Sequence, residues 1–133
     1  RLRTQEGENP TERLGSFIER ALTPPQRDDQ QAFQTAMLEV KAQAPYNDAF
    51  NDQIARFDGL LYEQCRSIIT DGIEQGVFRE VDADAVATFF VALCNGAHVL
   101  WVTENRSADT MRRLFIDYVE SQLLADTPEP AVE

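Results

Sequence analysis

The sequence predicts an all-α domain, and three observations support this fold class. Apolar residues recur at the i, i+3, i+4 and i+7 spacing of a helix along five segments. Residues that begin helices precede these segments, and no segment alternates apolar and polar residues as a half-buried strand does. A chain of 133 residues can bury one core. We therefore expect one domain over residues 9–125, with residues 126–133 as a flexible tail.

The first two helices are predicted from their start signals and apolar stripes. Asn9 is followed three residues later by Glu12, which is typical of a capping box. A second start falls at Asp28, with Gln31 three residues on, and Pro45 ends this helix. The expected buried faces are Leu14, Phe17, Ile18, Ala21 and Leu22 in the first helix, and Phe33, Ala36, Met37, Val40 and Ala44 in the second.

The third helix is the longest that the sequence predicts, from about residue 47 to residue 75. Gly76 suits a left-handed position after its end, with Val77 and Phe78 packing back on the last turn. Its expected buried face consists of Phe50, Ile54, Phe57, Leu61, Cys65, Ile68 and Gly72.

The fourth and fifth helices begin at capping residues, Asp82 and Ser107. The fourth is apolar almost all round, which predicts a central helix covered on every side. A membrane span is the alternative, because residues 86–102 reach the short limit for crossing a bilayer. We expect no membrane partner, since the flanks carry Asp82, Asp84 and Glu104 in place of basic anchors.

The charge of the chain is strongly acidic, with 23 acidic side chains against 12 basic ones and a formal net charge of −11. Phosphate binding needs a basic face, so general nucleic-acid binding by this chain is excluded. Lys41 is the only lysine. Such a composition fits a halophilic source, and it fits equally an ordinary acidic surface that keeps a protein soluble. Cys65 and Cys94 lie in apolar patterns, which indicates buried thiols in a reducing, cytoplasmic compartment.

The two last helices carry more apolar surface than one chain of this size can cover. Pairing them with their twins across a two-fold axis forms a four-helix bundle and removes the exposed patch. Gly96 would let two helix backbones approach, although it could instead pack against the third helix. The expected homodimer interface consists of Ala92, Gly96, Val99, Phe115, Tyr118, Val119 and Leu123.

The junction between the third and fourth helices resembles one found in a known family. Residues 73–87 read Ile-Glu-Gln-Gly-Val-Phe-Arg-Glu-Val-Asp-Ala-Asp-Ala-Val-Ala, and Gly96 lies within the helix that follows. This is similar to the regulatory domains of the tetracycline-repressor (TetR) family of transcriptional repressors. The resemblance implies a five-helix C-terminal domain that binds a small effector and dimerises. It also implies that operator DNA is bound by an N-terminal helix-turn-helix domain absent from this chain, with residues 1–8 as the remnant of a connecting helix.

A ligand cavity between the helices would be lined by their inner faces. Large aromatic residues with a methionine suit a small hydrophobic or aromatic effector. Asn95 and His98 are the available polar anchors. The expected ligand-binding residues are Phe17, Phe33, Met37, Phe57, Leu61, Leu93, Asn95, His98 and Trp101, each of which could instead simply fill the core.

Other chemistries find little support in the sequence. Cys94 and His98 stand at i, i+4 and could hold a metal, but no further ligands strengthen that pattern, and we expect neither a metal nor a cofactor. No Gly-rich phosphate loop or nucleophile elbow occurs, so we do not expect an enzyme. The serious alternative is a dimeric helical interaction module without a ligand, and the presence or absence of a cavity distinguishes the two.

Overall fold

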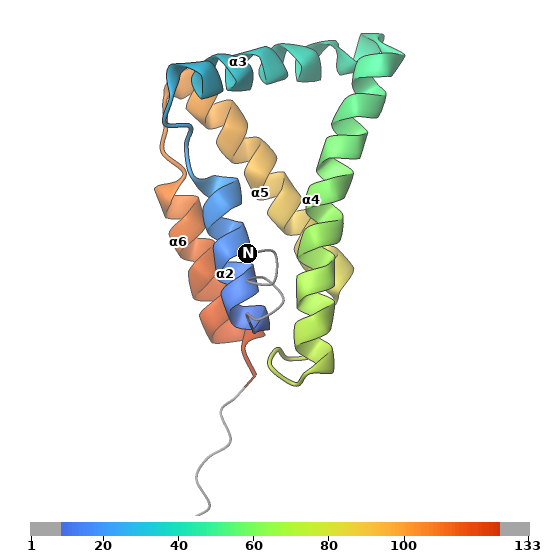
Figure 1. Cartoon of the computed structure of the whole chain (residues 1–133), viewed down its shortest axis with the longest axis vertical. Coiled ribbons are helices and arrows are strands. Elements are labelled where there is room, and N and C mark those ends of the chain that lie inside the picture. The colour runs from blue at the N-terminus through green and yellow to red at the C-terminus, as the bar shows by residue number, and fades with distance from the viewer. Residues whose placement is uncertain (1–8, 126–133) are drawn as a thin grey trace, which may run out of the picture.

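The computed structural model describes residues 9–125, and within this range the chain is helical without a strand (Figure 1). The predicted remnant at residues 1–8 and tail at residues 126–133 lie outside the described residues. A 3-10 turn, Ala44–Tyr46, joins the second and third helices, and a π-helical turn, Val119–Leu123, follows the last one. The helices are α2 (Pro10–Leu22), α3 (Asp28–Gln43), α4 (Asp48–Glu74), α5 (Ala83–Glu104) and α6 (Asp109–Tyr118). The all-α prediction is confirmed.

The arrangement of the helices places α3 across one end of the domain. In Figure 1, α3 lies across the end of the domain where α5 finishes and α4 begins. α4 packs against α5 and α2, while α2 also packs against α6. α2, α3, α4 and α5 therefore surround a common volume, and α6 supports α2 from outside it.

Three of the predicted helix starts are confirmed by hydrogen bonds. The Glu12 N–H donates to Asn9 Oδ1 at 2.8 Å, and the Asn9 N–H donates to Glu12 Oε1 at 3.2 Å, which completes the capping box. The Asn47 side chain accepts from the Phe50 N–H. The Asp82 side chain accepts from the Ala85 N–H in the same way. These caps satisfy N–H groups that have no partner within the helix.

Two predicted starts differ in detail. Arg27 occupies the cap position of α3, and Gln30, not Gln31, reaches back, its Oε1 accepting the Arg27 N–H at 3.3 Å. Asp28 is thus the first helical residue, where its charge favours the helix dipole. The last helix begins at Asp109, whose N–H donates to Ser107 Oγ at 3.0 Å. Ala108 therefore occupies the cap position, and the Ser107 hydroxyl that was expected there lies one residue before it.

The turn between α4 and α5 follows the prediction and adds a contact that the sequence did not indicate. Gly76 has φ 75°, and Phe78 packs back on α4 with 3% of its surface exposed. The following residues then meet the C-terminal end of the fold. The Arg79 N–H donates to the Leu123 carbonyl at 2.7 Å, and the Ala125 N–H donates to the Val77 carbonyl at 2.9 Å. These two hydrogen bonds tie the turn between α4 and α5 to the residues that follow α6.

The core lies where α2, α4, α5 and α6 meet. Phe90 of α5 is fully buried, and its ring lies 5.1 Å between centroids from both Phe17 of α2 and Phe115 of α6. Such tilted aromatic pairs stabilise a core beyond their area alone. These three rings join α2 and α5 to α6.

In the single chain, the fourth predicted helix, α5, is covered on one side only, as expected from the excess of apolar surface on the last two helices. Within α5, only Ala87, Phe90 and Ala97 are buried, whereas Phe89 is 58% exposed. Among the described residues, α5 is the one helix long and apolar enough to cross a membrane by length and composition alone. Two polar residues within it, Asn95 and His98, are hydrogen-bonded to α4 and α3.

Candidate functional site

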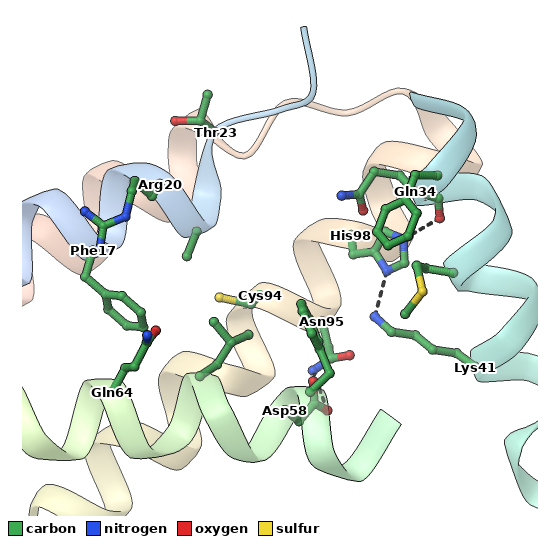
Figure 2. Close-up of a pocket in the computed structure, with 15 residues that line it drawn as sticks. Phe17, Arg20, Thr23, Gln34, Lys41, Asp58, Gln64, Cys94, Asn95 and His98 are labelled. Carbon is green, nitrogen blue, oxygen red and sulfur yellow. Dashed lines mark hydrogen bonds between the residues drawn. The ribbon is translucent and has the colours of Figure 1, made fainter. Parts of the chain in front are cut away.

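A cavity of about 530 Å³ lies between α2, α3, α4 and α5 (Figure 2). Each helix contributes side chains, so the site depends on the tertiary fold and not on one local motif. The residues lining it are Phe17, Arg20, Ala21, Thr23, Phe33, Gln34, Met37, Lys41, Phe57, Asp58, Leu61, Gln64, Cys94, Asn95 and His98.

Most of the sequence-predicted ligand residues meet at this cavity. Phe17, Phe33, Met37, Phe57, Leu61, Asn95 and His98 all line it. Leu93 and Trp101 do not. Leu93 packs against the core, because its position on α5 is turned about 100° from that of Cys94. Trp101 lines a smaller cavity of about 70 Å³, which shares Cys94 and His98 with the main one.

The apolar wall of the cavity reaches the surface. Phe33 is 59% exposed and Phe57 is 50% exposed, although both line the cavity. A second, shallower hollow of about 760 Å³ beside the α2–α3 connection shares Arg20 and Phe33 with it. The cavity therefore opens to solvent next to exposed aromatic rings, which gives a small molecule a route inside.

One polar group of the cavity pairs α4 with α5. The Asn95 amide donates to Asp58 Oδ2 at 3.2 Å and to the Val91 carbonyl at 3.1 Å. Asp58 brings a negative charge to the α4 wall between two apolar lining residues, Phe57 and Leu61. Asn95 was predicted from the sequence as an anchor, but its acidic partner was not.

A second polar group connects α3 with α5 (Figure 2). The Lys41 ammonium donates to His98 Nδ1 at 2.6 Å, and His98 Nε2 lies 2.7 Å from the Gln34 carbonyl oxygen. This pattern requires a neutral imidazole with its proton on Nε2. Burial lowers the pKa of His98, which supports that state. Burial also lowers the pKa of Lys41, and attraction to Asp58 offsets only part of the shift.

Sequence reasoning missed the charged lining residues. Lys41 continues the i, i+4 series of Phe33 and Met37 on one face of α3, and it is the only lysine in the chain. That combination could have identified it. Asp58 offered no such signal, because acidic residues are frequent throughout α4. The other missed lining residues are Arg20, Ala21, Thr23, Gln34, Gln64 and Cys94.

The Cys94–His98 pair does not form the start of a metal site. Both ring nitrogens of His98 are already engaged, and burial raises the pKa of the Cys94 thiol to about 12, which keeps it protonated. Among residues 9–125 no three His, Cys, Asp or Glu side chains come together as metal ligands would.

The residues predicted for a dimer interface differ in how far they are exposed in the single chain. Ala92 and Val99 are exposed on α5, and a Cβ at Gly96 would meet no atom of the described residues within 4 Å. This finding leaves no support for packing of Gly96 against the third predicted helix, α4. Tyr118 is half-buried. Phe115, Val119 and Leu123 are buried in the chain's own core and are not available at its surface.

Two other exposed apolar side chains on α5 and α6 were not predicted as interface residues. Phe89 on α5 and Leu114 on α6 are each 58% exposed. Phe89 lies one turn before Ala92 and belongs to a stripe with Gly96 and Val99 at helical spacing. The ring of Phe89 lies 6.2 Å from that of buried Phe115, so this stripe continues the core to the surface.

Comparison with known proteins identifies a family with this architecture. Residues 10–124 match the family model described as the BetI-type transcriptional repressor, C-terminal. A TetR transcription regulator from Haloarcula marismortui has a similar solved structure, with a TM-score of 0.80 and 28% identity, over 92% of this chain and 65% of that one. No curated protein matches the chain.

A second solved structure adds a bound ligand. A protein from Saccharomonospora viridis described as a transcriptional regulator, in complex with choline, superposes with a TM-score of 0.75 and 28% identity, over 90% of this chain and 62% of that one. The chain thus spans less than two thirds of either regulator. With the family model covering nearly all of the described residues, the chain belongs to the TetR family of transcriptional regulators, as a C-terminal domain of the BetI type.

Proposed function

We propose that this domain senses a small-molecule effector in the cavity between α2, α3, α4 and α5 and forms a homodimer through α5 and α6. The observation that carries the proposal is the cavity itself, about 530 Å³, with polar groups set in an apolar wall. Ligand sites of proteins are typically cavities of about 300–1,000 Å³ with this character. A ligand-free interaction module would have no use for it.

The effector is a small molecule with an apolar or aromatic body. Phe17, Phe33 and Phe57 offer ring faces, and Met37 offers an adaptable side chain that fits irregular shapes. Choline in the Saccharomonospora viridis protein supports the idea that this fold accommodates a small organic molecule.

The dimer interface is the exposed stripe on α5 together with α6. Phe89, Ala92 and Val99 would be covered by the partner, with Gly96 allowing the two α5 backbones to approach. Leu114 extends this apolar surface onto α6. A second copy placed across a two-fold axis would complete a four-helix bundle and cover the exposed part of α5.

The cavity and the interface share one helix, which supplies a route for regulation. α5 carries Asn95 and His98 on its cavity side, and Gly96 and Val99 on its exposed side. An effector that binds one position of α5 better than another would favour one arrangement of the two subunits. In the whole regulator, such a shift in subunit arrangement would change the spacing of the two DNA-reading domains. The affinity for operator DNA would change with it, in the cytoplasm.

A thermal-shift screen of apolar small molecules, with choline included, tests the sensing function. Phe57→Ala removes a cavity ring and is expected to weaken binding of any hit by about tenfold. Leu60→Ala is the matched control, because Leu60 is 61% exposed on the same helix and does not line the cavity. Equal binding by both variants, or a screen with no stabilising ligand, contradicts the proposal.

A further inference from the structure

The single lysine of this acidic chain lies in the cavity. Twenty-three acidic side chains could have paired with it at the surface, yet Lys41 is half-buried on α3 among the lining residues. Partial burial removes some of the hydration of the ammonium, and an anion in the cavity would replace the lost interaction. The position of Lys41 therefore calls for a partner within the cavity.

Within the described part of the chain, Lys41 lacks a carboxylate partner. Its one hydrogen bond is to His98 Nδ1 at 2.6 Å, and a neutral imidazole does not compensate a positive charge. An ammonium has three N–H groups, so two are left for other acceptors. Asp58 attracts Lys41 from across the cavity, but its Oδ2 already accepts a hydrogen bond from Asn95.

The charge balance of the cavity is opposite to that of the whole chain. Arg20 and Lys41 line it with positive charge, and Asp58 is the one acidic lining residue. The chain as a whole carries −11. Acidic surroundings would draw cations to the surface of this protein, whereas the cavity presents an excess of positive charge to whatever enters it.

From these observations we infer that the effector carries an anionic headgroup, of the organic carboxylate class, which Lys41 binds while the aromatic wall holds its apolar body. The inference rests on the proposed sensing function and adds the chemistry of the headgroup. A carboxylate accepts hydrogen bonds from the two remaining N–H groups of Lys41 and supplies the negative charge that its neighbours lack. Arg20, exposed at the rim beside Phe17, attracts the same group on its way in.

Three ligands of one skeleton test the headgroup directly: 3-phenylpropionate, 3-phenylpropanol and 3-phenylpropylammonium. We expect calorimetric titration of the intact chain to give the lowest Kd for the carboxylate, by about tenfold over the alcohol. Lys41→Gln should remove that preference, and Lys41→Arg should keep most of it. Arg56→Gln is the control, because it removes one positive charge from α4 at an exposed residue that does not line the cavity.

The possible outcomes separate this inference from the proposed function. Equal Kd values for the three ligands, or tightest binding of the ammonium, overturn the anionic headgroup while leaving an effector cavity in place. No binding by any of the three, together with no hit in the wider screen, overturns both. Because the three ligands are compared on the unmodified chain, the result stands even if a Lys41 variant fails to fold.

Discussion

His98 is the residue whose protonation most directly changes the cavity. His98 Nδ1 accepts a hydrogen bond from the Lys41 ammonium, and His98 Nε2 donates one to the Gln34 carbonyl. A second ring proton, on Nδ1, would break the first of these bonds and repel the ammonium. Burial lowers the pKa of His98 below its ordinary 6.5. The folded state therefore binds this proton more weakly than the unfolded chain does, and the stability from neutral His98 is present above pH 6.5 and lost as pH falls through the folded pKa.

The pH dependence of melting checks this assignment. We expect the Tm of the wild-type domain to fall on acidification from pH 7 to pH 5 more steeply than that of His98→Gln, which keeps an amide donor but cannot gain the charge. The carboxylates of the chain titrate in both proteins and cancel in the comparison. Parallel profiles for the two proteins would show that His98 is already protonated or fully solvated.

Gly72 offers a second prediction at the scale of one residue. A Cβ at this position would lie 2.1 Å from the Phe78 ring, which packs on it where the chain turns from α4 to α5. Gly72→Ala should lower the free energy of unfolding by about 1–3 kcal/mol, because the buried ring must move. Gly15→Ala is the control, since nothing lies within 4 Å of its Cβ, and it should stabilise α2 by up to about 1 kcal/mol. Urea denaturation of both variants measures the difference.

At the scale of elements, α5 has one covered side and one exposed side, and a sequence pattern cannot separate them. Its apolar residues predicted a helix that one chain cannot cover completely, and the single chain does cover only the side that carries Phe90 and Ala97. Periodicity indicates which residues share a face and does not indicate whether the covering atoms belong to the same chain. For the same reason, Phe115 was predicted at the interface, although the structure buries it against Phe90.

The exposed face of α5 gives a prediction for assembly. Gly96→Leu adds a side chain where the described part of a single chain leaves open space, so it should weaken the dimer without disturbing the fold. Sedimentation velocity should show more monomer for Gly96→Leu than for Gly15→Leu, which makes the same change at an open position on α2. A dimer unaffected by the α5 substitution would place the interface elsewhere.

At the scale of the whole molecule, the fold could be predicted in more detail than the site. Caps such as Asn9 and Asp82 determine local structure through neighbours in sequence, and the structure confirms them. The aromatic wall could also be predicted. Phe33 and Phe57 each belong to the apolar stripe of their own helix, and both stripes reach the cavity. The pairing of Asp58 with Asn95 joins residues far apart in sequence, and only the tertiary arrangement reveals it.

The two methionines allow the most direct test that the cavity is the effector site. Met37 lines the cavity, whereas Met111 packs against the core from α6 and does not line it. With ¹³C-methyl methionine in the chain, titration with 3-phenylpropionate should shift the Met37 signal progressively and leave the Met111 signal in place. A ligand that moves Met111 while Met37 stays unchanged would bind outside the cavity, and that result would contradict the account.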